Sequence, residues 1–196
     1  RQESGDRDAG IVAATEAIPI GMPRDENTRF GPLVHPDHLQ TVLGYVEAGK
    51  QEGATLACGG RAITQGPLAA GNFMEPTVFT DVTPSMRIWK EEIFGPVVVI
   101  TKATGIDDIV AQANDTGYGL AASIWTKDLK TAHTLARRIH AGTVWFNLHN
   151  FVFPSAPYTG YGLSGVGSEL GREGMLALTR IKNIMVSLFP GGFRWY

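Results

Sequence analysis

The most informative stretch of the chain is Trp89-Lys90-Glu91-Glu92-Ile93-Phe94-Gly95-Pro96-Val97. Its Gly-Pro pair predicts that the preceding local structure ends and that the chain turns into a strand starting at Val97. An ionised Glu92 offers two acceptor oxygens, which is enough to bind two neighbouring hydroxyl groups of a ligand. Taken alone, the same residues also fit two solvated glutamates, Glu91 and Glu92, at a helix end, followed by a core aromatic, Phe94.

Upstream of this stretch and just after it, the chain alternates between one clear helix and short strands. Apolar residues recur at helical spacing after His35-Pro36-Asp37 and predict an amphipathic helix that runs to about Lys50. The weak periodicity of residues 61–72 predicts a surface loop. Strands are predicted by β-branched and apolar content at Ala54–Cys58, Pro76–Thr80 and Val97–Thr101.

The second half of the chain alternates regularly between strands and helices. Apolar helical faces are predicted over Ile106–Ala113 and Leu129–Ile139, with apolar strands at Leu120–Thr126 and Thr143–Asn147. Apolar strands that alternate with helices imply crossover connections. We therefore expect an α/β fold in which a largely parallel sheet is flanked by helices.

The C-terminal part has a different pattern. The glycine-rich stretch Phe151–Gly167 shows no helical periodicity, and a last helix is predicted near Ser168–Thr179. Beyond it, Ile184–Phe189 is predicted to be a strand with apolar residues on both faces. Such a strand needs to be covered, because an exposed apolar edge promotes association.

The overall composition excludes several classes of function. The 196 residues carry a formal net charge of -2, so no basic field favours nucleic acid or an anionic membrane as a partner. No apolar stretch approaches the length of a bilayer span, and the N-terminal residues are polar rather than signal-like. The single cysteine excludes an internal disulfide framework. We therefore expect a cytoplasmic protein.

Three weaker signals are interpreted as structural. Gly160-x-Gly162-x-x-Gly165 has the spacing of a dinucleotide fingerprint, but prolines precede it where a strand is required. His35 and His38 are spaced like metal ligands, yet no cysteine or second pair supports them, so we expect no metal site and a solvated helix start. Cys58 is expected to be a small, partly buried residue.

The ordered series of motifs resembles the aldehyde dehydrogenase superfamily. Glu91–Pro96 is similar to that family's Glu-Ile-Phe-Gly-Pro signature, and Asp25–Val34 is most similar to betaine aldehyde dehydrogenases. From about Ile18 to Leu188 the chain resembles the part of these enzymes that follows the catalytic nucleophile. Further landmarks are Gly21-Met22-Pro23, Glu75-Pro76-Thr77-Val78-Phe79, Ala113-Asn114-Asp115-Thr116 and Ala141-Gly142-Thr143-Val144-Trp145-Phe146-Asn147.

The resemblance implies the C-terminal portion of an enzyme that oxidises an aldehyde to a carboxylic acid with NAD or NADP. In the family a cysteine thiolate forms a thiohemiacetal, hydride passes to the nicotinamide, and an activated water releases the acid. The nucleophile, the general-base glutamate and the Rossmann-type domain would all precede residue 1. We therefore expect no catalytic residue in the chain, and neither turnover nor cofactor binding by the chain alone.

The resemblance also implies how the chain is organised and assembled. We expect a polar N-terminal segment at residues 1–17, a partial catalytic domain at residues 18–180, and an oligomerisation strand with a tail at residues 181–196. In the family the last strand joins a sheet that bridges subunits. The chain would therefore form a homo-oligomer through Ile184–Phe189.

Several site residues follow from the resemblance. Glu92 would hold the nicotinamide-side ribose and Phe94 would pack near the nicotinamide. Asn147 would organise the active-site backbone, although a strand-end residue that caps the next loop fits it equally well. The substrate tunnel would be lined by Phe151, Val152, Phe153 and Tyr158. These side chains suit an apolar or aromatic aldehyde, and inward packing as core is an equal alternative.

Two positions depart from the family pattern. Gly162 stands where a lysine is usual and Ser168 where an arginine is usual, so contacts made by those cations are not expected, although the backbone turn is. A different class of function also stays open. The chain can be a non-catalytic α/β module that keeps the scaffold for binding or assembly.

Overall fold

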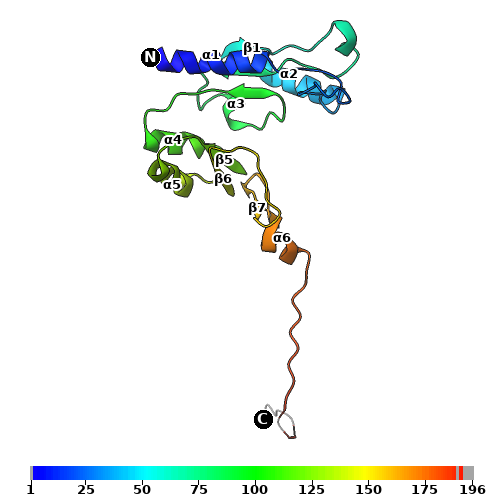
Figure 1. Ribbon diagram of the computed structural model, residues 1–196, viewed down its shortest axis with the longest axis vertical. Helices are drawn as coiled ribbons and strands as arrows, with labels where there is room; N and C mark the ends of the chain where they lie inside the picture. Colours follow the sequence, from blue (N-terminus) through cyan, green and yellow to red (C-terminus); the bar gives the residue numbers. More distant parts are fainter. Residues whose placement is uncertain (1, 189, 192–196) are drawn as a thin grey trace. The chain divides into compact units, whose positions relative to one another are not determined.

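The computed structural model describes residues 2–188 and 190–191 (Figure 1). The chain forms two compact units, unit 1 (residues 1–117) and unit 2 (residues 118–196). The boundary lies inside the stretch 18–180 that the sequence predicts as one partial catalytic domain. Glu92 and Phe94 belong to unit 1, whereas Asn147 and the candidate substrate-side residues belong to unit 2.

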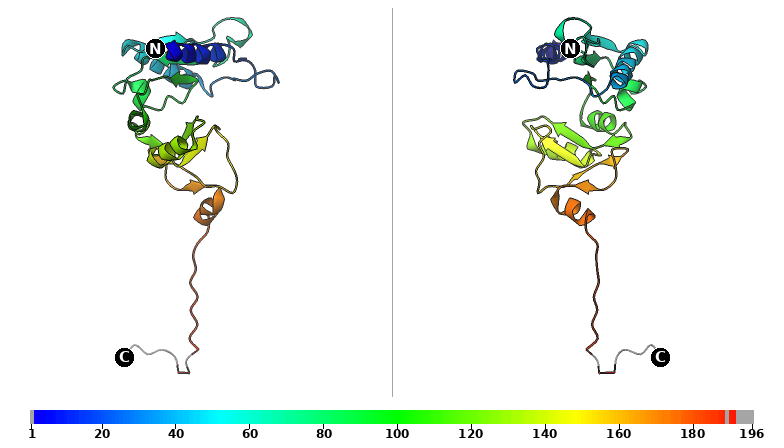
Figure 2. Two further views of the ribbon diagram at one scale, coloured as in Figure 1. Left: turned by 60° about the vertical axis from the view of Figure 1, so that its left-hand side comes forward. Right: turned by 90° about the vertical axis from the view of Figure 1, so that its right-hand side faces the viewer.

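Unit 1 consists of a small sheet with helices on both sides. The strands β1 (Thr55–Cys58), β2 (Thr77–Thr80) and β3 (Val97–Val99) lie in that order, with β1 antiparallel and β3 parallel to β2. Figure 2 shows α1 (Gln2–Glu16) and α2 (Pro36–Gln51) on opposite sides of this sheet, and both helices contact β1. The central strand β2 is therefore covered on both faces.

The start of the helix α2 is set by two residues, the N-cap His35 and Pro36 in the first turn. His35 is the N-cap, and its Nδ1 accepts a hydrogen bond from the Asp37 N–H at 3.2 Å. Pro36 occupies the first turn, where its missing N–H removes no helical hydrogen bond. Val42 and Val46 are completely buried one turn apart, so the apolar face of α2 packs into the core as its periodicity predicts.

The core of unit 1 extends into the motif stretch. Met74 and Phe79 are completely buried, and Ile93 belongs to the same cluster at 9% exposure. The motif therefore contributes a core residue between two exposed neighbours. The remaining helices of the unit are short: the 3-10 helix η1 (Gly66–Leu68), α3 (Arg87–Lys90) and α4 (Ile106–Ala113).

Unit 2 is built on one parallel strand pair. The strands β5 (Ala121–Ile124) and β6 (Thr143–Phe146) pair in parallel and are connected by α5 (Leu129–Arg138), which makes a crossover unit. Asp128 caps α5 by accepting hydrogen bonds from the N–H groups of Lys130 and Thr131. The short antiparallel pairs are β4 (Tyr118–Gly119) with β8 (Tyr161–Gly162) and β7 (Tyr158–Thr159) with β9 (Ser168–Glu169).

The predicted α/β class is confirmed. The described strands form several small sheets, in which β2–β3 and β5–β6 are parallel and β1–β2, β4–β8 and β7–β9 are antiparallel. The last predicted helix is the shorter α6 (Gly171–Ala177). The polar segment predicted at residues 1–17 contains α1, which the sequence does not signal because its few apolar residues form no continuous helical stripe. Within the described ranges, no helix is long and apolar enough to cross a bilayer.

The predicted strand Ile184–Phe189 is not formed in the single chain. Residues 181–188 follow α6 without helix or strand (Figure 1). Ile184, Met185, Val186 and Leu188 are all at least 74% exposed, and Phe189 lies outside the described residues. A strand needs a hydrogen-bonded neighbour, and the described part of this chain supplies none to the segment.

Candidate functional site

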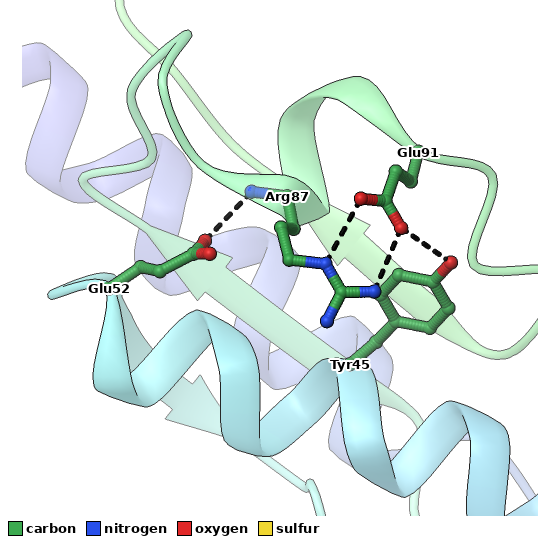
Figure 3. Close-up of polar contacts among 4 residues, drawn as sticks. All are labelled: Tyr45, Glu52, Arg87 and Glu91. Atoms are coloured by element: carbon green, nitrogen blue, oxygen red, sulfur yellow. Dashed lines mark hydrogen bonds and ion pairs between the residues drawn. The ribbon is translucent and has the colours of Figure 1, made fainter.

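The motif loop, residues 91–95, is tied to α2 first through Glu91. The Tyr45 hydroxyl donates to Glu91 Oε2 at 2.9 Å, and Arg87 donates to both carboxylate oxygens at 3.0 and 2.9 Å (Figure 3). Arg87 also lies 5.1 Å from the centre of the Tyr45 ring, and its backbone N–H donates to Glu52 at 2.7 Å. Glu91 is therefore a structural residue at the C-terminal end of α3.

The same contacts shift the acidity of the three groups. The hydrogen bonds from Arg87 and then from Tyr45 hold the pKa of the Glu91 carboxyl below its ordinary value. The hydrogen bond to Glu91 raises the pKa of Tyr45, and the pKa of Arg87 is raised by the same carboxylate. All three shifts favour the charge state that keeps the cluster together near neutral pH.

Acid is expected to destabilise this cluster. A group whose folded-state pKa is depressed contributes stability above its unfolded-state pKa, and the contribution is lost as the pH falls through the folded-state pKa. Urea unfolding of the protein over an acid pH series should therefore show a steeper loss of stability for the wild type than for Glu91→Gln. Glu47→Gln, a surface glutamate of α2 paired with Lys50, is the matched control. Equal pH slopes for the wild type and Glu91→Gln would contradict the prediction.

Three further contacts fix the rest of the loop. Ile93 is buried in the core of unit 1. His38 Nε2 lies 2.7 Å from the backbone oxygen of Phe94, and since that oxygen only accepts, the ring nitrogen donates. Gly95 packs so closely on α2 that a Cβ there would lie 2.7 Å from both γ carbons of Val42. Only glycine permits this approach.

These ties leave two side chains of the loop pointing into solvent. Phe94 is 75% exposed and its backbone has a φ of 51°, which is unusual for a non-glycine residue. The alternative that Phe94 is a core aromatic is therefore wrong. Glu92 is exposed, and within the described residues its carboxylate makes no hydrogen bond or ion pair. The loop presents a carboxylate without a partner among the described residues and, two residues on, a largely exposed aromatic ring.

In unit 2, Asn147 joins the ends of β5 and β6. Its Oδ1 accepts from the Thr126 N–H at 2.9 Å, and its Nδ2 donates to the Thr126 carbonyl at 2.9 Å. Its own backbone N–H donates to the Ile124 carbonyl at 2.9 Å, and its φ is 50°. The side chain thus organises backbone at the carboxyl end of a parallel strand pair, where α/β proteins place functional groups.

The segment after Asn147 presents apolar side chains at the surface. Phe151, Val152 and Phe153 are each about half exposed, at 50%, 46% and 55%, and the two phenyl rings meet edge to face at 4.8 Å. The indole N–H of Trp145 donates to the Phe151 carbonyl at 2.8 Å and holds the segment to β6. The alternative that these three side chains pack inward as core does not describe this structure.

Tyr158 lies in a different setting from the two phenylalanines. It belongs to β7, is half-buried, and lines a cavity of about 370 Å³ together with Leu120, Ser164 and Val166. The two positions that depart from the family pattern are in strands nearby in sequence: Gly162 pairs with Tyr118, and the hydroxyl of Ser168 hydrogen-bonds that of Thr159.

The weaker sequence signals resolve as follows. His35 is the N-cap of α2, as expected for a solvated helix start. The same expectation is wrong for His38, because its ring hydrogen-bonds the Phe94 carbonyl. Cys58 is more deeply buried than predicted, at 8% exposure. The stretch 160–165 forms β8 and a turn, and α6 begins only at Gly171, so it lacks the helix that a phosphate loop needs.

Sequence reasoning missed two contacts of the site. His38 is 56 residues from its partner Phe94, and no local pattern signals such a pair. Ser123 Oγ lies 2.9 Å from His149 Nδ1, and the His149 ring meets Trp145 edge to face at 5.7 Å, which further orders the segment after β6. Both contacts arise from tertiary packing of elements that the sequence predicts only singly.

Comparison with known proteins covers both units. The sequence model of the aldehyde dehydrogenase family matches residues 8–184. Betaine aldehyde dehydrogenase from Staphylococcus aureus, solved in complex with NAD+, is 36% identical with a TM-score of 0.91 over 96% of this chain and 38% of its own. An apo variant of that enzyme reaches a TM-score of 0.94 at 35% identity, over 100% of this chain and 39% of its own.

An aldehyde dehydrogenase variant from Bacillus cereus is 42% identical, with a TM-score of 0.84 over 89% of this chain and 35% of its own. The chain therefore spans well under half the length of the solved enzymes that it matches. The family match covers most of the chain and crosses the boundary between the two units. The motifs predicted from the sequence lie within the matched residues, and the chain belongs to the aldehyde dehydrogenase family.

Proposed function

We propose that this chain is the C-terminal portion of an NAD(P)-dependent aldehyde dehydrogenase that oxidises an aldehyde to a carboxylic acid. The observation that carries the proposal is the loop 91–95, whose contacts with α2 leave Glu92 and Phe94 exposed. The match to the family over residues 8–184 supports it, as does the complex of the Staphylococcus aureus enzyme with NAD+.

Glu92 and Phe94 fit the nicotinamide end of a dinucleotide. An unpaired carboxylate accepts hydrogen bonds from both hydroxyls of a ribose, and an exposed phenyl ring offers an apolar surface beside the nicotinamide. When bound, the nicotinamide supplies a hydride acceptor. In this proposal Glu92 holds the ribose and Phe94 limits the position of the ring, while the chain alone binds no cofactor measurably, because the phosphate and adenine contacts belong to another domain.

The substrate side is proposed to lie in unit 2. Phe151, Val152 and Phe153 offer a partly exposed apolar wall, and Tyr158 lines a cavity of the same unit. Asn147 acts as a positioning residue that sets where this segment leaves β6. Such a wall favours an apolar or aromatic aldehyde over a charged one, because apolar surface is favourably buried against apolar surface.

The thiohemiacetal step needs a thiolate, and Cys58 does not supply one. Its side chain is buried at the end of β1, and burial raises the pKa of the thiol. A raised pKa keeps the group protonated and unreactive near neutral pH. The proposal therefore assigns the nucleophile, the general base and the dinucleotide-binding domain to residues outside this chain.

The proposed enzyme is a cytoplasmic homo-oligomer. Residues 181–188 carry the exposed apolar side chains Ile181, Ile184, Met185, Val186 and Leu188. Isolated apolar side chains are common on surfaces, but a run of them on extended chain is suited to adding a strand to a neighbouring sheet edge. Pairing with another subunit would give residues 181–188 the ladder hydrogen bonds of a sheet, since they belong to no sheet among the described residues.

Aldehyde-dependent reduction of NAD or NADP tests the proposed function. The complete enzyme should reduce the cofactor with aromatic or aliphatic aldehydes, and the 196-residue chain alone should not. Comparison of benzaldehyde-like, alkyl and amino aldehydes by kcat/KM then identifies the substrate class. Turnover by the isolated chain, or no turnover by the complete enzyme with any of these aldehydes, would overturn the proposal.

A further inference from the structure

Among the described residues, the side chain of His38 hydrogen-bonds one group, the Phe94 carbonyl. His38 lies in the first turns of α2, and its Nε2–H donates to the Phe94 carbonyl at 2.7 Å. The other ring nitrogen, Nδ1, is buried and has no hydrogen-bond partner among the described residues. The tilted ring also lies 6.0 Å from the Phe94 ring, centre to centre. The imidazole therefore serves as an N–H donor aimed at the loop.

The hydrogen bond from His38 is made to the loop residue that has an unfavourable backbone conformation, Phe94. Phe94 adopts a φ of 51°, a left-handed conformation that costs a phenylalanine free energy. The neighbouring residues are held by other means, Ile93 by burial and Gly95 by its close approach to Val42. Among the described residues, the hydrogen bond from His38 is the one contact of the loop made to the Phe94 carbonyl itself.

The φ angle of Phe94 sets how its ring lies relative to the Glu92 side chain. Glu92 and Phe94 lie on either side of the buried Ile93, and a rotation about the N–Cα bond of Phe94 carries both its ring and its carbonyl relative to Glu92. A donor that holds the carbonyl therefore also holds the ring. A site that binds one rigid ligand through two groups loses affinity when their spacing varies. The donor that fixes the peptide therefore controls the affinity of the site.

We propose that His38 is a positioning residue for the nicotinamide cofactor. Its hydrogen bond to the Phe94 carbonyl fixes the strained backbone of Phe94 and thereby keeps the Glu92 and Phe94 side chains at a constant spacing. The proposal rests on the proposed function, since it explains how the two side chains of the same cofactor site are held relative to each other. His38 itself contributes no group to the chemistry. Its contribution is to lower the cost of ordering the loop when the cofactor binds.

The test compares three substitutions of His38 in the complete enzyme. His38→Gln places an amide N–H close to the position of Nε2, His38→Asn has the same chemistry but is too short to reach it, and His38→Leu removes the donor. We expect the dissociation constant for NAD to rise about 2- to 10-fold in His38→Leu and His38→Asn, the range for one neutral hydrogen bond, and to be restored in His38→Gln. Gln40→Leu on the same helix is the matched control.

Two readouts separate positioning from a general loss of structure. KM for NAD should rise in His38→Asn while KM for the aldehyde stays constant, whereas damage to the fold would change both. In a Glu92→Gln background His38→Leu should add little, because the two changes act on the same interaction. Full additivity, or wild-type affinity in both His38→Leu and His38→Asn, would overturn the inference. Normal NAD binding by Glu92→Gln would instead overturn the proposed function.

Discussion

Glu92→Gln in the complete enzyme is expected to raise the dissociation constant for NAD by about 10- to 100-fold. A hydrogen bond to a charged group is worth about 1.5–3 kcal/mol, and about 1.4 kcal/mol is a tenfold change in binding. Glutamine keeps the size of the side chain but turns one acceptor into a donor, so it cannot accept from both hydroxyls of a ribose. Titration calorimetry or fluorescence titration with NAD measures the change.

The structure offers a close control for this substitution. Glu47→Gln removes a surface carboxylate of the same unit, one that already pairs with Lys50 at 2.7 Å, and should leave NAD affinity unchanged. The folded state should tolerate Glu92→Gln, because the Glu92 side chain is exposed and has no partner among the described residues. An unchanged melting temperature together with unchanged NAD affinity would refute the role assigned to Glu92.

A double substitution in the C-terminal segment, Ile184→Lys with Val186→Lys, is expected to dissociate the proposed homo-oligomer. Side chains two apart on an extended chain share one face, so both would enter the same covered surface. Burying an aliphatic side chain is worth about 1.5–3 kcal/mol, and an unpaired charge in its place is unfavourable. The subunit dissociation constant should therefore rise by about 100-fold or more.

Sedimentation velocity over a concentration series measures the dissociation. Asn183→Ser, which changes a polar residue on the opposite face of the same segment, should leave the assembly intact. Hydrogen exchange gives an independent view, because pairing with another subunit would protect the amides of residues 181–188. A wild-type protein that stays monomeric at every concentration while these amides exchange slowly would contradict the assignment.

The elements with strong local signals could be predicted from the sequence. The helix α2 was predicted to within a residue or two at each end, because the spacing of its apolar residues and Pro36 point to the same boundaries. The crossover unit β5–α5–β6 was predicted because apolar strands alternate with a helical stripe. Residues 184–188 form no strand in the single chain, and their prediction as a strand that pairs with another subunit stays a prediction.

The candidate site could be predicted only as separate residues. The positions of Glu92 and Phe94 came from their motif, but nothing local indicates that Phe94 adopts a positive φ or that His38 binds its carbonyl. The exposure of Phe151 and Phe153 was equally undecided, since an apolar side chain fits a core and a pocket wall alike. In each case tertiary contacts, which periodicity does not encode, decide the outcome.

The contacts of Asn147 mean that a side chain takes the place of a peptide group. Beyond the last paired residues, Ile124 and Phe146, the Asn147 amide offers Thr126 one acceptor and one donor, as a backbone peptide would. Hydrogen bonding to Thr126 therefore continues past the end of β6 through a side chain. The backbone leaves the sheet at one residue, Asn147, whose hydrogen bonds hold the end of β6 in place. The segment that carries Phe151 and Phe153 therefore begins at a fixed point and not at a frayed strand end.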